Sequence, residues 1–211
     1  MKQLYLSTAY WAPVSSYAAI FRHNGATIEQ YDTYVKQTYR NRCHIIGPAG
    51  VQALTIPVVK PLAGTPTRDI LISEHGNWRH LHRMAIASAY GSSPFYEYYA
   101  DDINRFYDKP CKYLLDYNLK QIECVCNWIE RYPAIACSTQ YSHDLPCDTT
   151  IDLRDAIHPK HPDETRIAPY LPRPYYQVFE AQTGFVCDAS ILDLLCNMGN
   201  ESLLVLLGIA S

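Results

Sequence analysis

Hydrophobic and polar positions alternate in short stretches of the first 75 residues, a spacing that is typical of β-strands. The predicted strands are Lys2–Leu6, Ala26–Gln30, Cys43–Gly47, Val51–Val59 and Asp69–Ser73. The third and fourth strands flank a Pro-Ala-Gly turn, which predicts a β-hairpin, and Pro57 is expected to mark an edge or an end of its strand. One segment between the strands, Pro13–His23, has apolar residues at helical spacing and predicts a helix.

The middle of the chain has a helical period. Asn77 and Ser93 are predicted to cap two successive helices, and a third helix is expected over Asp116–Arg131. Beyond them the pattern predicts a buried strand over Ala134–Ser138 and a further strand over Tyr175–Phe179. Two last helices are expected to start near Ser190 and Asn200.

The segment from Tyr141 to Pro174 is rich in proline and lacks an amphipathic period, so it is expected to form a long loop or a lid. Residues 1–211 are therefore expected to form a single domain of the α/β class, or alternatively of the α+β class. Its sheet is expected to be mixed, with flanking helices and a helical middle section.

Composition narrows the function. The 211 residues include 18 Lys and Arg against 21 Asp and Glu, which excludes the basic surface of a protein that mainly binds nucleic acid. No apolar run approaches the roughly 20 residues of a membrane span, and the amino terminus does not resemble a signal peptide. We therefore expect a cytoplasmic protein with reduced cysteines; the chain has no CxxC pair, and neither a metal site nor a cofactor is expected.

The densest cluster of polar residues is predicted to bind a ligand. Lys36, Arg40, Arg42 and His44 share one parity, so on a strand they would converge on one face, and Tyr39 and Asn41, which alternate with them, are included as candidate substrate-binding residues. Such a face suits a nucleotide-sugar diphosphate, the phosphopantetheine of an acyl carrier, or a carboxylate. The alternative is a basic strand edge that only discourages aggregation.

A second cluster contains the candidate catalytic residue. His82 lies four residues after Trp78 on a predicted helix, and its near-neutral titration suits a general base; the alternative is a histidine packed on an aromatic ring. Tyr96 and other tyrosines can line a sugar-binding cleft or belong to the core. Asp152 and Arg154 can contact substrate or form an ion pair with another segment.

One family resemblance spans nearly the whole chain. Its residues are Lys36-Gln-Thr-Tyr-Arg-Asn-Arg42, the hairpin with Leu54-Thr-Ile-Pro-Val58, Trp78 and His82, Ser93-Pro-Phe-Tyr96, Asp152-Leu-Arg154, Tyr175-Tyr-Gln-Val-Phe179 and Ser190-Ile-Leu-Asp-Leu-Leu195. In this order they resemble the WbqC-like family. The resemblance implies a place in bacterial surface-polysaccharide and O-antigen biosynthesis, and a glycine or amino-acid transferase role onto sugars has been suggested for some members.

The expected function is therefore a transferase that moves an acyl or aminoacyl group, such as glycyl, onto an activated sugar. The expected partners are small molecules, with a nucleotide-sugar or an acyl carrier as candidates, and the oligomeric state stays open. The alternative is a non-catalytic ligand-binding or assembly protein of the same biosynthesis. Walker A, GxGxxG and HExxH motifs are absent, which argues against ATPases, dehydrogenases and zinc proteases.

Overall fold

Four parallel strands form the main sheet of the protein, in the order β5-β2-β1-β6. The computed structural model describes residues 2–209. The strands are β1 (Gln3–Ser7), β2 (Gly25–Glu29), β5 (Ala134–Cys137) and β6 (Thr150–Asp152). Parallel strands need crossover connections, and helix α1 (Val14–Arg22) supplies the first of them, between β1 and β2. The α/β class expected from the sequence is confirmed.

A separate antiparallel hairpin contains the last two residues of the predicted ligand-binding cluster, Arg42 and His44. Strand β3 (Arg42–Gly47) pairs with β4 (Gly50–Thr55), and His44 lies opposite Ala53. Pro57 follows the end of β4, as predicted, since proline cannot continue a ladder of hydrogen bonds. A short 3-10 helix, η1 (Tyr39–Asn41), leads directly into β3.

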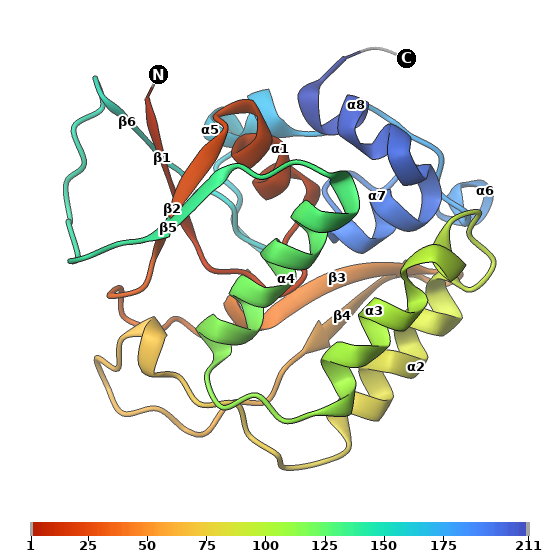
Figure 1. Cartoon of the computed structure of the whole chain (residues 1–211), viewed down its shortest axis with the longest axis horizontal. Helices are drawn as coiled ribbons and strands as arrows, with labels where there is room; N and C mark the ends of the chain where they lie inside the picture. The colour runs from red at the N-terminus through yellow and green to blue at the C-terminus, as the bar shows by residue number, and fades with distance from the viewer. Residues whose placement is uncertain (1, 210–211) are drawn as a thin grey trace.

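Helices cover the sheet and the hairpin (Figure 1). Their bounds are α2 (Trp78–Tyr90), α3 (Tyr96–Asp108), α4 (Leu114–Ile129), α5 (Glu164–Ile167), α6 (Glu180–Thr183), α7 (Ile191–Met198) and α8 (Ser202–Leu207), with 3-10 helices η2 (Thr67–Asp69), η3 (Ala168–Tyr170) and η4 (Gly199–Glu201). The predicted helical middle is confirmed as α2, α3 and α4. No helix within residues 2–209 combines the length and the apolar character that crossing a membrane requires.

Contacts between distant parts of the chain bring α7 onto α1. The Ser190 hydroxyl donates to the Trp11 carbonyl at 2.8 Å and accepts from the Leu192 N–H at 3.3 Å, which caps α7. Pro13, just before α1, forms a β-bridge with the same serine. The start of α1 and the start of α7 are thereby held side by side.

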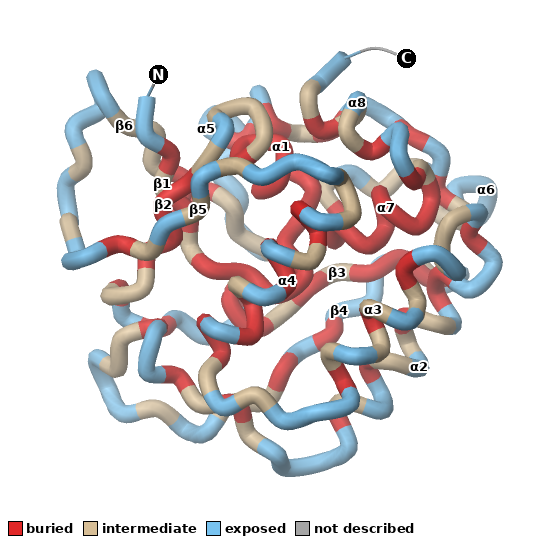
Figure 2. Tube along the Cα trace, in the orientation of Figure 1, coloured by how far each residue is buried: buried red, intermediate tan, exposed pale blue. Residues whose placement is uncertain are grey.

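The buried residues concentrate where β1, β2, α1, α7 and β3 meet, as Figure 2 shows in red. Tyr10, Trp11, Tyr17 and Tyr90 are completely buried there. The Trp11 ring stacks on Trp128 with the centroids 6.0 Å apart, a contact that adds to the burial of apolar area. The four largest fully buried side chains of the described residues are therefore aromatic.

Three predicted strands differ from the structure. Tyr175–Phe179 is not a strand: the Val178 N–H donates to Asn197 Oδ1 at 3.2 Å, and the Gln177 carbonyl accepts from the Glu180 N–H at 2.9 Å as the chain turns into α6. Asp69–Ser73 contributes only isolated bridges, one of them Val58 to Ile72. Strand β5 is confirmed, but it lies at the edge of the sheet and is half exposed rather than buried.

The proline-rich segment 141–174 is not continuous loop. It contains β6, α5 and η3, and β6 pairs with β1 through Leu4 and Ile151. This edge strand brings the residues that follow it, 153–158, to the carboxyl end of β1, where the candidate site is found.

Candidate functional site

The direction of the chain connections reverses between β1 and β6. Strands β2 and β5 follow β1 on one side of the sheet, whereas β6 returns to its other side. In open parallel sheets, ligands bind at the carboxyl ends of the strands where such a reversal occurs. A small cavity of about 20 Å³, here called the switch-point hollow, lies at this place and is lined by Ser7, Thr8, Ser16, Arg40, Arg154 and Asp155 together with Tyr39 and His158.

Arg154 is held by ion pairs beside this hollow. Its guanidinium donates to Asp152 at 2.7 and 2.9 Å, and its Nη1 lies 3.3 Å from Glu29 Oε2. Glu29 is 1 % exposed and also accepts from the Ser138 hydroxyl at 2.7 Å. The sequence allowed Asp152 and Arg154 either to contact substrate or to form an ion pair with another segment. The ion pair is present, between Arg154 and Glu29, and it connects the residues after β6 to the end of β2.

Arg40 is buried on the other side of the hollow. Its Nη2 forms an ion pair with Asp32 and donates to the Ser7 hydroxyl at 2.9 Å. The Nε of Arg40 is buried without a hydrogen-bond partner. A buried donor in this state costs free energy unless something binds it, so it is a feature that points to a ligand or an ordered water.

The predicted convergence of four cationic side chains on one strand face is wrong. Only Arg42 and His44 belong to β3, since the preceding residues form η1 and a turn instead of a strand. Lys36 is exposed, Arg40 points to the switch-point hollow, and the Nε of Arg42 donates to Thr55 Oγ1 at 3.1 Å. A strand alternates its side chains only where it is extended, and here it begins at Arg42.

A larger cleft of about 470 Å³ adjoins the hollow and shares Tyr39 and His158 with it. We call it the Tyr39 cleft. Its titratable side chains are Tyr39, His44, His158, Glu164, Cys187 and Asp188. Its wall is apolar, with Ile46, Ile167, Leu171 and Val186. An apolar cavity with a few converging polar groups is the usual form of a small-molecule site.

Asp188 is the most perturbed carboxylate of the Tyr39 cleft. It accepts from the backbone N–H and the hydroxyl of Ser15 at 2.7 and 2.8 Å, at the start of α1. Burial raises the pKa of Asp188 to about 6, although the hydrogen bonds from Ser15 act against this shift. Its φ of 58° lies in the left-handed region, which non-glycine residues rarely adopt outside constrained sites. Asp188 can therefore exchange a proton near neutral pH.

His44 is a second proton acceptor in the same cleft. Burial, and next the charge of Arg42, lower the pKa of His44, so that its imidazole is neutral at pH 7. Its ring lies edge-on to Tyr39 at 5.5 Å, and burial followed by the charge of Asp188 raises the pKa of this tyrosine. The Tyr39 cleft thus combines a neutral base with a carboxyl group of raised pKa.

His158 stands between the cleft and the hollow. Its Nδ1 accepts from the backbone N–H groups of Lys160 and His161 at 3.0 and 3.1 Å. The neutral ring therefore carries its hydrogen on Nε2. Burial and the nearby cationic groups lower the pKa of His158, so it is a hydrogen-bond donor and not a charge at pH 7.

His82, the predicted general base, is buried in the aromatic core. The Trp11 indole N–H donates to the Tyr107 hydroxyl at 3.0 Å, Tyr107 bonds Tyr10 at 2.6 Å, and Tyr10 bonds His82 Nδ1 at 2.9 Å. The His82 ring donates to the Thr55 backbone, so in the neutral ring Nδ1 accepts from the Tyr10 hydroxyl. Tyr10 has only one hydroxyl hydrogen, so it accepts from Tyr107 in turn. His82 lines neither the Tyr39 cleft nor the switch-point hollow. Its catalytic role stays a prediction, and the packing matches the alternative of a structural histidine.

Burial lowers the pKa of His82 to about 4, and this has a consequence for stability. In the unfolded chain His82 takes up a proton below about pH 6.5, whereas in the folded protein it stays neutral down to about pH 4. The free energy of unfolding therefore falls by about 2–3 kcal/mol between pH 7.5 and pH 4.5. In His82→Gln we expect this loss to disappear. Urea unfolding of both proteins at the two pH values measures it.

The comparison must be made between the variant and the natural chain at each pH. Burial raises the pKa values of Asp188 and Asp193 to about 6, so both favour the folded state as the pH falls and oppose the effect of His82. Equal pH dependence of the two proteins would contradict a neutral, buried His82.

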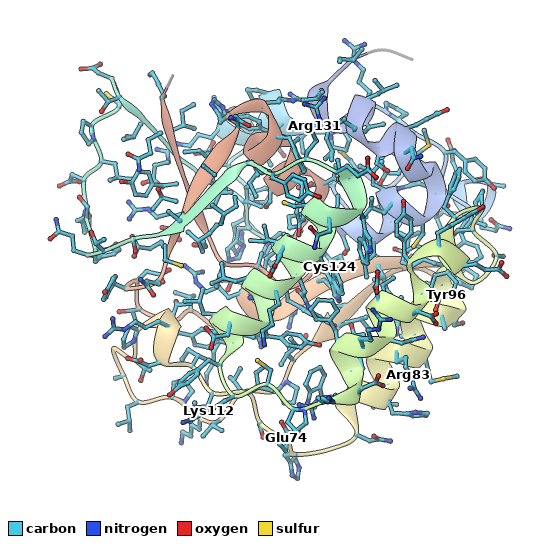
Figure 3. The ribbon with its side chains drawn as sticks, viewed as in Figure 1. Glu74, Arg83, Tyr96, Lys112, Cys124 and Arg131 are labelled. Atoms are coloured by element: carbon cyan, nitrogen blue, oxygen red, sulfur yellow. The ribbon has the colours of Figure 1, made fainter. Side chains whose placement is uncertain are left out.

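The other predicted site residues lie away from the cleft. Asn41 is buried and donates to the Ile56 carbonyl at 2.8 Å, and Trp78 packs edge-on against His82 at 5.2 Å. Tyr96 begins α3, and Figure 3 shows it near Arg83 of α2. The structure therefore brings together Tyr39, Arg40, His44 and Arg154 around the two cavities, and not the remaining predicted residues.

Sequence reasoning missed the most informative group of the site. Asp188 lies just before the helix predicted to start near Ser190 and was given no role of its own, while His158 and Glu164 lie in the segment predicted as loop. The single usable signal was Asp188 itself, a carboxylate placed two residues before the Ser190 cap.

Comparisons with known proteins complete the description of the site. No curated protein and no solved structure matches the chain. Among protein families, residues 10–162 match the WbqC-like protein family, which is more than half of the chain and includes Tyr39, Arg40, His44, Arg154 and His158. The chain belongs to the WbqC-like protein family.

Proposed function

We propose that the chain transfers an acyl or aminoacyl group to the amine of an activated sugar, with the Tyr39 cleft as its active site. The observation that carries this proposal is the presence of His44 and Asp188, a neutral base and a carboxyl group titrating near pH 6, in one largely apolar cleft. General acid–base catalysis works best with groups whose pKa lies near the working pH. The family resemblance supports surface-polysaccharide biosynthesis as the setting.

The reaction needs one base and no covalent intermediate. The lone pair of the neutral amine attacks the carbonyl carbon of a thioester donor, and His44 takes the proton that the nitrogen loses. The new C–N bond forms, the C–S bond breaks, and the proton passes from His44 to the departing thiolate. Burial and the charge of Asp188 raise the pKa of the Cys187 thiol, which makes it a poor nucleophile for a two-step route.

The charges of the Tyr39 cleft favour an amine over an anionic acceptor group. Glu164 and Asp188 contribute carboxylates, and the described residues that line the cleft include no arginine and no lysine. An ammonium group is attracted to such a site before it loses its proton, whereas a diphosphate is repelled. If the acceptor is a nucleotide-sugar, its diphosphate would therefore lie outside this cleft.

The test is a transfer assay with purified protein. Acetyl and glycyl thioesters are combined with nucleotide-activated amino sugars, and mass spectrometry detects the new amide. We expect product from at least one pair, and thermal stabilisation by the same sugar. No product and no stabilisation from any pair would overturn the proposal. Stabilisation without turnover would favour the non-catalytic binding protein, with which the absence of an activated thiol in the cleft also agrees.

A further inference from the structure

The switch-point hollow has the size of a single polar group. Its volume is about 20 Å³, against about 470 Å³ for the adjoining Tyr39 cleft. A site this small suits one small polar group of a ligand better than the diphosphate that the sequence suggested for Arg40.

The groups around the hollow complement a hydroxyl. The Nε of Arg40 is a buried donor without a partner, on a side chain that is 5 % exposed. Asp155 contributes a carboxylate whose Oδ1 lies 4.0 Å from Arg40 Nη2. A hydroxyl can accept from the first and donate to the second at once, which neither an ammonium nor a carboxylate can do.

The balance of charges around the switch-point hollow also favours a neutral hydroxyl over an anion. Asp32 already neutralises Arg40, and Glu29 and Asp152 more than neutralise Arg154. The hollow therefore has no surplus positive charge for an anion, and burying one there without a counter-ion is costly. A neutral polar group carries no such penalty.

The hollow is continuous with the proposed active site through Tyr39 and His158, which line both cavities. We infer that the switch-point hollow binds one hydroxyl group of the acceptor sugar, between Arg40 and Asp155, while the sugar ring packs along Tyr39 and presents its amine to His44. This inference rests on the proposed function and adds the means by which the acceptor is recognised and oriented. Pyranose rings commonly pack their apolar face on an aromatic side chain.

Calorimetric titration with amino sugars tests the inference. The probes are the methyl glycosides of glucosamine and galactosamine and their monodeoxy derivatives, each lacking one hydroxyl. We expect one deoxy derivative to bind about 10–100-fold more weakly than its parent, because Arg40 and Asp155 then lose a charge-assisted partner.

Asp155→Asn identifies the place where that hydroxyl binds. The Asp155 side chain is 92 % exposed, so its replacement leaves the fold intact. Asp155→Asn should weaken the binding of the parent sugar by most of the factor that separates it from the sensitive deoxy derivative. The same substitution should weaken the binding of that deoxy derivative only slightly, because the hydroxyl and Asp155 are partners in one contact. Ser16→Ala, also in the lining, is the second variant, and Asp101→Asn on the exposed side of α3 is the control that changes neither affinity.

The outcomes separate this inference from the proposed function. If an amino sugar binds and all deoxy derivatives bind equally, the hollow holds an ordered water only and the inference is wrong, while the transferase proposal stands. The inference is also wrong, and the transferase proposal stands, if a deoxy derivative binds more weakly than its parent by the same factor in the natural chain and in Asp155→Asn. If no methyl glycoside binds the natural chain, the inference falls, while the transferase proposal is decided by the assay with nucleotide-activated amino sugars.

Discussion

Replacing His44 with glutamine is expected to lower kcat/KM for acyl transfer by about 10²–10⁴-fold, the usual contribution of a general base. Glutamine is close to histidine in size and can still hydrogen-bond, but it cannot take a proton at neutral pH. Because His44 is half-buried in the lining of the Tyr39 cleft, we expect the replacement to leave the fold unchanged. Steady-state kinetics of the purified variant, with a melting temperature alongside, measures the effect.

His82→Gln is the matched control, because it makes the same chemical change in the aromatic core. If His44 is the base, this control retains the kcat of the natural chain at pH 7.5, and the opposite pattern would assign the reaction to His82. The pH profile adds a second readout. The lowered pKa of His44 places the acid limb of kcat/KM below pH 6.5, and this limb should be absent from the residual activity of His44→Gln.

Replacing Arg154 with methionine is expected to lower the free energy of unfolding by about 3–5 kcal/mol. Methionine keeps most of the side-chain volume but leaves Glu29, which is 1 % exposed, without its cationic partner. An uncompensated buried carboxylate is among the costliest defects of a folded protein. Denaturant unfolding at pH 7.5 gives the value.

The control for this prediction is Arg166→Met. Arg166 also pairs with a carboxylate, Asp163 at 3.3 Å, but both side chains are about half exposed, and such pairs contribute less than about 1 kcal/mol. Similar losses in the two variants would show that Glu29 does not depend on Arg154.

Local patterns were sufficient for most elements of the fold. The helix over α1, the β3–β4 hairpin and the helices α2 to α4 were all predicted, because each depends on a period or a turn within about 15 residues. Tyr175–Phe179 reads as a strand because its residues favour extended backbone, yet the Asn197 side chain takes the hydrogen bond of the Val178 N–H that a neighbouring strand would have taken.

The candidate site was less predictable, for a physical reason. Parity identified Arg40 and His44 as members of one cluster, but η1 turns the backbone between them, so that they enter two different cavities. Asp188 is bonded to Ser15, 173 positions earlier in the chain. No pattern within a short window of the sequence contains such a contact.

That long separation has a consequence for the synthesis of the protein. The Tyr39 cleft takes Tyr39 and His44 from the first quarter of the chain and Asp188 from the last, and Ser190 holds the two parts together through Trp11. During synthesis on the ribosome, the Tyr39 cleft cannot form completely until residue 190 has emerged, because Asp188 belongs to its lining. During this interval the apolar wall residues already synthesised lack their final cover, and exposed apolar surface makes an incompletely folded chain prone to aggregation.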